Sequence, residues 1–261
     1  KGMRLDNSMI FDLTIQMYTL LVIAAFLAGR VDAIAGGGGL ITLPILLLAG
    51  INPISALATN KVQGCFGAAT AAYSYSRAGH VELGSQILAA SIAFGAGALG
   101  ALAIGMIPTE GLRLGLPIIL ITIALFFALK PGLTDEDKTR RISAPAFTAF
   151  FVPFIGAYDG LVGPGAGAFY MIGFVLLAGF GVLKATAHTK LLNFSSNFGS
   201  LLVFALHGAP LWGLGLSMGV AQIIGARVGS GIAMQVGVRV IKPLLVVTST
   251  LLAGRLLWQM L

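Results

Sequence analysis

Long apolar stretches alternate with short polar ones along nearly the whole chain. Apolar segments are expected at about residues 9–34, 40–50, 54–76, 84–106, 112–129, 144–161, 166–181, 184–206, 210–233 and 241–260. Several of them approach or exceed the roughly 20 residues with which an α-helix spans a bilayer. The second segment of each half, 40–50 and 166–181, is short, and it either crosses at a tilt or folds back as a re-entrant hairpin. The pattern predicts an all-α polytopic membrane protein with about 8–10 membrane helices.

The composition requires lipid as the solvent for most of the surface. Hydrophobic residues make up 57% of the 261 residues and charged residues 10%, whereas a soluble domain carries about 25% charged residues. Mean hydropathy is +0.96, and no long polar stretch could form a second domain. The lone Cys65 lies in an apolar stretch, where packing is its expected role. The first apolar run belongs to a segment that recurs later, so we interpret it as part of the fold and not as a cleavable signal peptide.

Two motifs, each containing small and charged residues, recur in the second half of the chain. Residues 29–39 (GRVDAIAGGGG) resemble residues 156–167 (GAYDGLVGPGAG), and residues 56–61 (ALATNK) resemble residues 185–190 (ATAHTK). The spacing is nearly constant, at 127 positions for the first motif and 129 for the second. Internal repeats of this kind are a hallmark of secondary transporters. The matched positions are Asp32 with Asp159, Gly36 with Gly163, Gly38 with Gly165 and Lys61 with Lys190.

The repeats divide the chain into two halves around one charged linker. We expect residues 1–130 to form the first repeat, residues 131–143 a cytoplasmic charged linker and residues 144–261 the second repeat, together one membrane domain. Each half makes five crossings if its short segment spans the membrane and three if it does not. Both numbers are odd, so the halves have opposite orientations in either case. The sequence therefore predicts an inverted repeat.

Positive charges assign the two sides of the membrane. The net charge is +7, and in a membrane protein such an excess marks cytoplasmic loops, so we expect no nucleic acid partner. One side receives Arg77, Lys130, Lys138, Arg140, Arg141, Lys184, Arg239 and Lys242, and the other mainly Lys1, Arg4 and Arg113. The positive-inside rule puts the first side in the cytoplasm. Both termini are then expected outside.

Glycine clusters interrupt one apolar segment of each half. The first cluster precedes a helix that we expect to restart at Leu40, with Pro44 in its first turn, and the second surrounds Pro164. Unwound backbone at membrane depth must be shielded by protein or line a polar cavity. A helix that starts there presents free N–H groups and the positive end of its dipole, which suits an anion. The alternative is that the glycines merely permit close helix packing.

Two lysines lie inside apolar segments at equivalent positions, Lys61 and Lys190. A buried charge in a bilayer costs about 2.5 kcal/mol or more on insertion scales, so each lysine should face a cavity or a partner unless it snorkels to a nearby interface. The candidate partners are Asp32 and Asp159, giving one carboxylate and one ammonium per half. Alternatively, the lysines meet an anionic substrate directly. The aspartates either form a structural ion pair or relay protons for coupling.

Further polar side chains cluster around the lysines and offer donors for an oxyanion or hydrogen bonds between helices. They are Asn60, Gln63, His188, Thr189, Asn193, Ser195, Ser196 and Asn197. The sequence contains no Cys/His metal framework, no phosphate-binding loop with a Lys-Ser/Thr end and no convincing Ser-His-Asp set. We therefore expect no enzymatic activity, no cofactor and no metal site, with the lipid bilayer and a small anion as partners.

The motifs resemble those of a known family. Residues 32–44 (DAIAGGGGLITLP), 58–61 (ATNK), 158–165 (YDGLVGPG) and 185–194 (ATAHTKLLNF) are similar to the motifs of the sulfite exporter TauE/SafE family, also called toluene sulfonate uptake permeases (TSUP). The likeness is greatest to a branch of bacterial inner-membrane permeases and covers nearly the whole chain. It implies a multi-pass carrier in the bacterial plasma membrane for sulfur-containing anions such as sulfite or sulfonates.

The residues and the resemblance together favour a secondary transporter of a small anion, in which one half rocks against the other to alternate access. A passive anion channel and a carrier for small carboxylates are the alternatives. We expect Asp32 and Asp159 to form a coupling or structural ion pair. The expected substrate-binding residues are Gly36, Gly37, Gly38, Gly39, Asn60, Lys61, Gly163, Gly165, Gly167, His188, Thr189, Lys190 and Asn193.

Overall fold

The computed structural model describes residues 13–104 and 135–237, with the isolated positions 106, 118 and 239. Within these residues the fold is all-helical, as the apolar pattern predicts. The predicted segments 112–129 and 241–260 lie outside the two described ranges. The helices are α2 (Ile15–Ala35), α3 (Gly38–Leu48), α4 (Pro53–Arg77), η1 (Leu83–Gln86), α5 (Ile87–Ile104), α7 (Ala144–Ala146), η2 (Phe147–Phe151), α8 (Val152–Leu161), α9 (Ala166–Leu176), α10 (Val182–Leu206) and α11 (Trp212–Val236).

The outer surface is that of a polytopic membrane protein. In the described part of the chain, α2, η1 with α5, and α11 are long and apolar enough to cross a membrane. Large apolar side chains point outward from the bundle: Leu99 on α5 is 67% exposed and Phe154 on α8 is 72% exposed. Lipid tails solvate such side chains as well as a protein core does, so this exposure is expected only in a bilayer.

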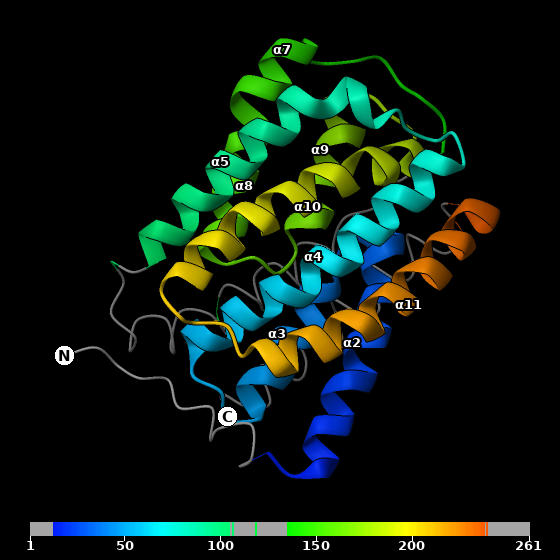
Figure 1. Ribbon diagram of the computed structural model, residues 1–261. Coiled ribbons are helices and arrows are strands. Elements are labelled where there is room, and N and C mark those ends of the chain that lie inside the picture. The colour runs from blue at the N-terminus through cyan, green and yellow to red at the C-terminus, as the bar shows by residue number, and fades with distance from the viewer. Residues whose placement is uncertain (1–12, 105, 107–117, 119–134, 238, 240–261) are drawn as a thin grey trace.

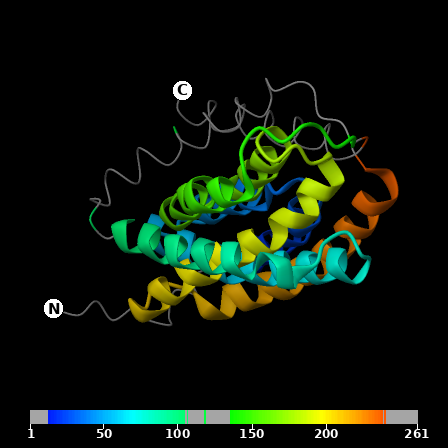
Figure 2. The ribbon, with the colours of Figure 1, turned by 90° about the horizontal axis from the view of Figure 1, so that it is seen from above.

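The two long helices that carry the polar motifs lie in the middle of the bundle. α4 and α10 have 25 residues each, and α10 packs between α4 and α5 (Figures 1 and 2). Their polar side chains are therefore turned toward other helices and away from lipid. Cys65 is buried on α4 beside Val62 and Leu201, which confirms its expected packing role.

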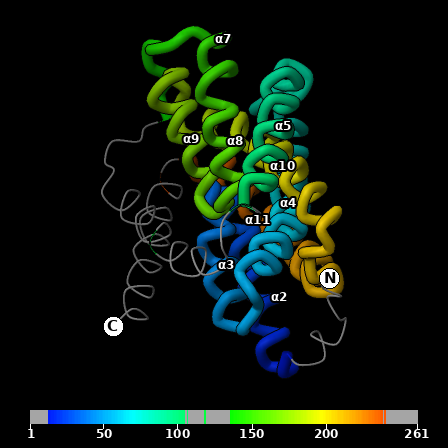
Figure 3. The backbone as a smooth tube through the Cα atoms, turned by 90° about the vertical axis from the view of Figure 1, so that its left-hand side faces the viewer, coloured from blue at the N-terminus to red at the C-terminus, as the bar shows by residue number. Residues whose placement is uncertain are grey.

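Each half contains a helical hairpin, and the two hairpins enter the bundle from opposite ends. α3 runs back toward the end of the molecule at which α2 begins, and α9 runs back beside α8 (Figures 1 and 3). Hydrogen bonds fix the return of α9, because Arg141 N donates to Leu177 O over 2.9 Å and Lys138 N donates to Gly179 O over 2.7 Å. The short segments 40–50 and 166–181 therefore fold back as hairpins, which was one of the two alternatives.

The first hairpin differs from the prediction in where its second helix begins. α3 starts at Gly38 and not at Leu40, so Pro44 lies inside the helix and not in its first turn. The reason is a cap that the pattern does not reveal: the Asp32 carboxylate accepts a hydrogen bond from Gly38 N. This acceptor satisfies a free N–H of the first turn and lets the helix begin earlier.

Neighbouring helices come largely from opposite halves of the chain. α2 packs against α11, and α8 packs against α5. Small residues permit this approach: a Cβ on Gly29 of α2 would lie 2.6 Å from the carbonyl oxygen of Gln222 on α11. The two halves are thus interleaved and not laid side by side.

The end of α4, the described part of the linker and the start of α10 lie at one end of the molecule (Figure 1). Arg77 belongs to the last turn of α4, and Lys184 to the first turn of α10.

Candidate functional site

The first break separates α2 from α3 by a left-handed glycine. Gly36 has φ of 80°, a conformation that is open to glycine but costly for residues with a Cβ. Its N–H donates to Asp32 O over 2.8 Å, which closes the end of α2. The Asp32 side chain reaches across the break to Gly38 N over 3.2 Å. Asp32 therefore accepts hydrogen bonds from backbone N–H groups both at the end of α2 and at the start of α3.

The second break has the same elements in a wider form. Gly163 and Gly165 have φ of 90° and 86°, and Pro164 between them cannot continue α8. Ala166 N donates to Gly163 O over 3.1 Å at the start of α9. The Tyr158 hydroxyl stabilises the unwound segment by donating to Pro164 O over 2.5 Å. Glycine is thus required here for backbone conformation as well as for space.

The two breaks meet each other inside the bundle. Ala168 N, in the first turn of α9, donates to Gly36 O over 3.0 Å. A Cβ on Gly167 would lie 3.0 Å from both Cα and O of Gly36, and a Cβ on Gly39 would lie 3.2 Å from Cα of Pro164. Backbone therefore packs directly on backbone where the hairpins touch. This contact shields unwound polypeptide from lipid, as a break at membrane depth requires.

Each of the two lysines in the repeated motif contacts the aspartate of the opposite half. Lys61 Nζ on α4 donates to Asp159 Oδ1 over 2.6 Å and to Asp159 O over 2.5 Å. Lys190 Nζ on α10 donates to the main-chain oxygen of Asp32. Both lysines are 1% exposed, so neither snorkels to an interface. The sequence identified the four residues, whereas their crossed pairing depends on the tertiary fold.

The two aspartates have unequal surroundings. Asp159 Oδ2 also accepts from Ser196 Oγ over 2.5 Å and from Asn197 Nδ2 over 3.0 Å. The Asp32 carboxylate accepts from Gly38 N alone among the described residues, and the described salt bridges do not include it. Donors therefore engage both oxygens of the Asp159 carboxylate, whereas among the described residues the Asp32 carboxylate accepts one hydrogen bond, from a backbone N–H.

Amide side chains from both halves complete the polar centre. Asn60 Oδ1 accepts from Thr42 Oγ1 over 2.6 Å and from Gln63 Nε2 over 3.0 Å. Asn193 Oδ1 accepts from Asn197 Nδ2 over 3.2 Å. Hydrogen bonds to Oδ1 thus fix the orientation of each of the two side-chain amides. In the described part of the chain, no hydrogen bond occupies the Nδ2 of either Asn60 or Asn193.

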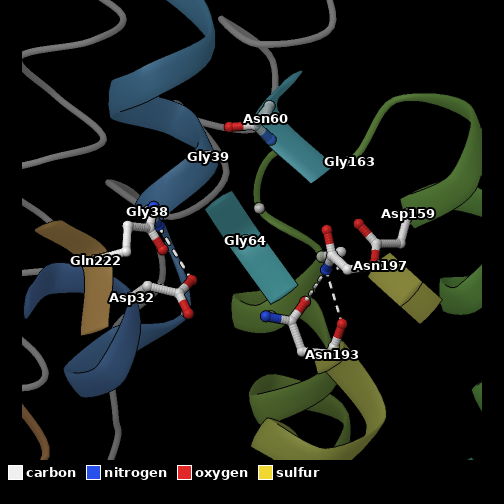
Figure 4. Close-up of a pocket in the computed structure, with 14 residues that line it drawn as sticks. Asp32, Gly38, Gly39, Asn60, Gly64, Asp159, Gly163, Asn193, Asn197 and Gln222 are labelled. Atoms are coloured by element: carbon white, nitrogen blue, oxygen red, sulfur yellow. Dashed lines mark hydrogen bonds between the residues drawn. The ribbon is translucent and has the colours of Figure 1, made fainter. Parts of the chain in front are cut away.

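A cavity lies where the breaks and these side chains converge (Figure 4). Its volume is about 30 Å³, and since one water needs about 10–15 Å³, it corresponds to two or three water molecules. Expected site residues that line it are Asp32, Gly36, Gly38, Gly39, Asn60, Asp159, Gly163, Gly165, Gly167 and Asn193. Those that do not are Gly37, Lys61, His188, Thr189 and Lys190.

Comparison with known sequences decides the family. The family model described as "Sulfite exporter TauE/SafE" matches residues 21–256. The chain belongs to the TauE/SafE family. A "Probable membrane transporter protein ORF9" of Sinorhizobium sp is 53% identical over 246 residues, covering 94% of each chain. "Probable membrane transporter protein YfcA" of Escherichia coli K12 is 43% identical over 240 residues, covering 92% of this chain and 89% of its own.

A further relative is more distant but covers as much of the sequence. A "Probable membrane transporter protein" of Haemophilus influenzae is 38% identical over 248 residues, covering 95% of this chain and 97% of its own. No solved structure matches the chain at a significant level. Together the family and these relatives make this TauE/SafE protein a membrane transporter.

Two expected site residues of this TauE/SafE protein serve other contacts. The His188 ring packs against Phe174 and Phe180, with centroids 5.6 Å and 4.8 Å away. The Thr189 hydroxyl donates to Ala185 O within α10 over 2.9 Å. They lie two positions and one position before Lys190 in sequence, but a helix turns successive residues to different faces. Adjacency to the lysine was therefore a poor guide to the cavity.

Four residues that line the cavity were not among the expected substrate-binding residues, namely Gly64, Ala166, Asn197 and Gln222. Of these, Asn197 was expected among the polar side chains near the lysines, and Ala166 lies within the second glycine cluster. Helical spacing could have indicated two of them. Gly64 lies one turn beyond Asn60, and Asn197 one turn beyond Asn193, so each shares a helix face with an expected residue. Gln222 on α11 comes from outside both repeated motifs, and the packing of α11 on α2 and α4 brings it to the cavity.

Proposed function

We propose that the protein is a secondary transporter that binds a small anion in the cavity between the two glycine breaks. The observation that carries this proposal is the convergence of two helix starts and two amide donors, one of each from either half of the chain. α3 and α9 begin at the cavity, and Asn60 and Asn193 line it. Helix starts and unengaged N–H groups are the elements from which anion sites are built.

The first turns of the two helices leave donors in matching places. In α3, Gly38 N donates to Asp32 and Leu40 N donates to Gly37 O. In α9, Ala166 N and Ala168 N donate to Gly163 O and Gly36 O. The N–H of the second residue, Gly39 or Gly167, is among those for which an α-helix provides no internal acceptor. These two N–H groups and the two amide nitrogens are the donors that we assign to the anion.

The substrate class that we propose is a sulfur-containing oxyanion or a small organosulfonate. The family description supports the sulfur chemistry. The cavity, at about 30 Å³, supports a compact anionic head group, and a bulkier tail would require it to widen. Several neutral donors around the charge favour a polarisable oxyanion with its charge spread over several oxygens.

Alternating access is the proposed mode of transport, and the hairpins are the proposed moving parts. α2 packs against α11 and α8 against α5, so rocking along the sequence boundary between the halves would disrupt the largest interfaces. Shifting α3 or α9 would instead open the cavity on one side while leaving those interfaces intact. The small size of the cavity, about 30 Å³, favours such a carrier over a passive channel.

The proposed location is the bacterial plasma membrane, with both termini in the periplasm. The gathering of Arg77, Lys184 and the linker cations at one end of the bundle supports a cytoplasmic position for that end. The bacterial relatives support the membrane.

Flux in proteoliposomes tests the proposal. Purified protein is reconstituted and offered sulfite, sulfate, methanesulfonate and acetate separately, and uptake is measured for wild type, Asn60→Ala, Asn193→Ala and the double variant. A hydrogen bond to a charged group contributes about 1.5–3 kcal/mol, so each single variant should bind the transported anion about tenfold to a hundredfold more weakly.

The control is Gln235→Ala, which removes an exposed amide near the end of α11 and should leave uptake unchanged. Unaltered affinity in the Asn60→Ala/Asn193→Ala variant would contradict the site. Turnover of many thousands of ions per second would indicate a channel. Uptake of acetate in preference to the three sulfur anions would indicate a carboxylate carrier.

A further inference from the structure

Among the described residues, the cavity carboxylate of Asp32 forms no salt bridge, whereas that of Asp159 forms one. Lys61 Nζ lies 2.6 Å from Asp159 Oδ1. The corresponding lysine of the other half, Lys190, donates to the main-chain oxygen of Asp32 and leaves its carboxylate to Gly38 N. Asp32 is also the more open of the two, at 9% exposed against 1% for Asp159. The two repeats are therefore equivalent in sequence and unequal in ion pairing.

We infer that Asp32 is the proton-binding residue that couples the transporter, and that one proton moves with each monovalent anion as an electroneutral symport. The inference rests on the proposed function, because it assigns the coupling ion of the same cavity. The sequence repeat makes the two aspartates look alike, but their roles differ: Asp159 is a structural partner of Lys61, and Asp32 carries the transported proton.

Charge balance is the first argument. Two buried aspartates line the cavity, and each binds one buried lysine through its main-chain oxygen. With all four groups ionised, their charges sum to zero. A monovalent anion in the cavity would leave one uncompensated negative charge, and a buried charge in a bilayer is costly. A proton on one carboxylate restores neutrality. Anion and proton therefore bind more favourably together than either does alone.

The hydrogen bonds favour Asp32 as the carboxylate that takes the proton. Lys61, Ser196 and Asn197 all donate to Asp159, and donors directed at a carboxylate stabilise its ionised form. Asp32 has the single N–H of Gly38. Asp32 also lines the cavity, where its charge would repel an anion until it is protonated (Figure 4).

Few other ionisable groups face Asp32 from the helices that pack around it. α10 contributes Lys190, α4 contributes Tyr75, whose hydroxyl donates to Ala33 O, and α8 contributes Asp159 with its lysine partner. Gln222 of α11 is polar but does not titrate, and Arg30 and Arg227 are exposed. Tyr75 and Lys190 are both already engaged, so Asp32 is the group in this set that can exchange a proton with the cavity.

In the proposed cycle, the only covalent bond of the protein that forms and breaks is the O–H bond between the proton and Asp32. A proton from water on the side of uptake forms an O–H bond with an Asp32 oxygen, and the anion enters the cavity. Once the cavity opens to the other side, the anion leaves and the proton returns to water. The empty carrier, again neutral overall, returns with Asp32 ionised and held by Gly38 N.

Proton flux and electrical response in the same proteoliposomes test this inference. Methanesulfonate is the probe, because its charge is fixed between pH 5 and pH 8, and a pH-sensitive dye is trapped inside. An inward methanesulfonate gradient should acidify the lumen of wild-type vesicles. Because the symport is electroneutral, uptake should not respond to a membrane potential set with potassium and valinomycin. Affinity should fall about tenfold per pH unit wherever Asp32 is ionised in the empty protein.

Asp32→Asn is the decisive variant, because its side chain is neutral at every pH and keeps an oxygen for Gly38 N. We expect it to bind methanesulfonate with pH-independent affinity, to carry no protons and to respond to the membrane potential. Glu82→Gln, an exposed carboxylate-to-amide change, should behave as wild type. If Asp32→Asn fails to fold, Asp32→Glu replaces it, and the pH at which affinity falls should shift.

Three outcomes would overturn the inference. They are uptake without lumen acidification, uptake that requires sodium and not protons, and an Asp32→Asn variant that keeps the wild-type pH dependence. All three leave anion uptake intact and so leave the proposed function standing. Absence of uptake for every anion offered would instead overturn the proposed function and this inference with it.

Discussion

Lys61 of the first half binds Asp159 of the second half through both the carboxylate and the main-chain oxygen. Two donor–acceptor pairs therefore join α4 to the last turn of α8, just before the chain unwinds at Gly163. The ion pair holds the second glycine break in position against the central helix. It also removes the Lys61 charge from the cavity, which leaves neutral N–H groups as the donors that face a substrate.

Loss of Lys61 should destabilise the fold strongly. Breaking a buried ion pair from one side costs about 3–5 kcal/mol, because the remaining charge is uncompensated. Lys61→Met should therefore lower the melting temperature in detergent by about 10 °C, and Asp159→Asn by less, because Lys61 keeps the Asp159 carbonyl oxygen. Recovery in the Lys61→Met/Asp159→Asn double variant is expected from the loss of both charges.

The control for this prediction is an ion pair with the same separation at the surface. Lys184 Nζ also lies 2.6 Å from an aspartate oxygen, that of Asp137, but the two side chains are 44% and 53% exposed. Exposed pairs contribute about 0–1 kcal/mol. Lys184→Met should therefore have little effect. Equal destabilisation by Lys184→Met and Lys61→Met would show that burial does not set the difference.

The contact between the two breaks predicts unequal effects of alanine at glycines with the same backbone conformation. Gly36 and Gly50 both have φ of 80°, so alanine strains the backbone equally at each. A Cβ on Gly36 would meet the backbone of Gly167 and Ala168, whereas at Gly50 it would meet nothing within 4 Å. Overpacking adds about 1–3 kcal/mol. Gly36→Ala should lower the melting temperature and abolish uptake, and Gly50→Ala should show only the smaller effect of strain.

The same comparison can be made between helical glycines. A Cβ on Gly167 would lie 3.0 Å from Gly36, whereas one on Gly231 of α11 would have open space. In a helix alanine is favoured over glycine by about 0.8–1 kcal/mol. Gly231→Ala should therefore be neutral or stabilising and Gly167→Ala destabilising. Melting temperatures that do not distinguish the two would contradict the packing of the breaks.

The repeated motifs predicted much of the site because its members are costly in a membrane. A lysine at membrane depth requires a partner, and a glycine cluster in an apolar run requires a break, so Lys61 and Gly36 were identifiable from sequence alone. Apolar length predicted the helices for the same reason. What the pattern could not supply was the choice between Asp32 and Asp159 for each lysine, because that choice depends on which helices pack together.

Some cavity residues outside the repeated motifs escaped prediction. Gln222 lies on α11, which the pattern marks only as an apolar crossing, and it reaches the site because α11 packs on α2. The start of α3 was predicted late because Asp32 caps it through a side chain that lies across the break. Side-chain and helix contacts that periodicity does not encode thus account for the errors, and local periodicity accounts for the correct predictions.

The linker end of the bundle should contribute stability that is lost in acid. Gly181 N and the Lys184 ammonium both donate to Asp137, and these two bonds lower the pKa of its carboxyl below the ordinary value of 3.8. A carboxyl with a lowered pKa in the folded state stabilises the fold above its ordinary pKa, and this contribution disappears as the pH falls through the lowered value. The affected window is therefore below about pH 4.

Asp137→Asn tests this prediction. At pH 7 the variant should melt slightly below wild type, by an amount equivalent to about 1 kcal/mol or less, because the pair is exposed and screened. The difference should shrink as the pH falls below 3.8. Glu82→Gln, at an exposed carboxylate, should show no such convergence. A difference between Asp137→Asn and wild type that grows in acid would have the wrong sign for this contact.

Ligand binding should stabilise the protein only while the amide donors are present. An anion that binds the folded state raises stability by about 2.7 kcal/mol at a hundredfold excess over its dissociation constant, which corresponds to a rise in melting temperature of about 5–10 °C. The transported sulfur anion should produce this rise in wild type and in Gln235→Ala. Asn60→Ala/Asn193→Ala should lose it at the same concentration, because its weakened affinity leaves the site largely empty. Sodium chloride at equal ionic strength is the reference, so that screening of surface charges is the same in every sample. A rise of the same size in the double variant would assign the stabilisation to another part of the molecule.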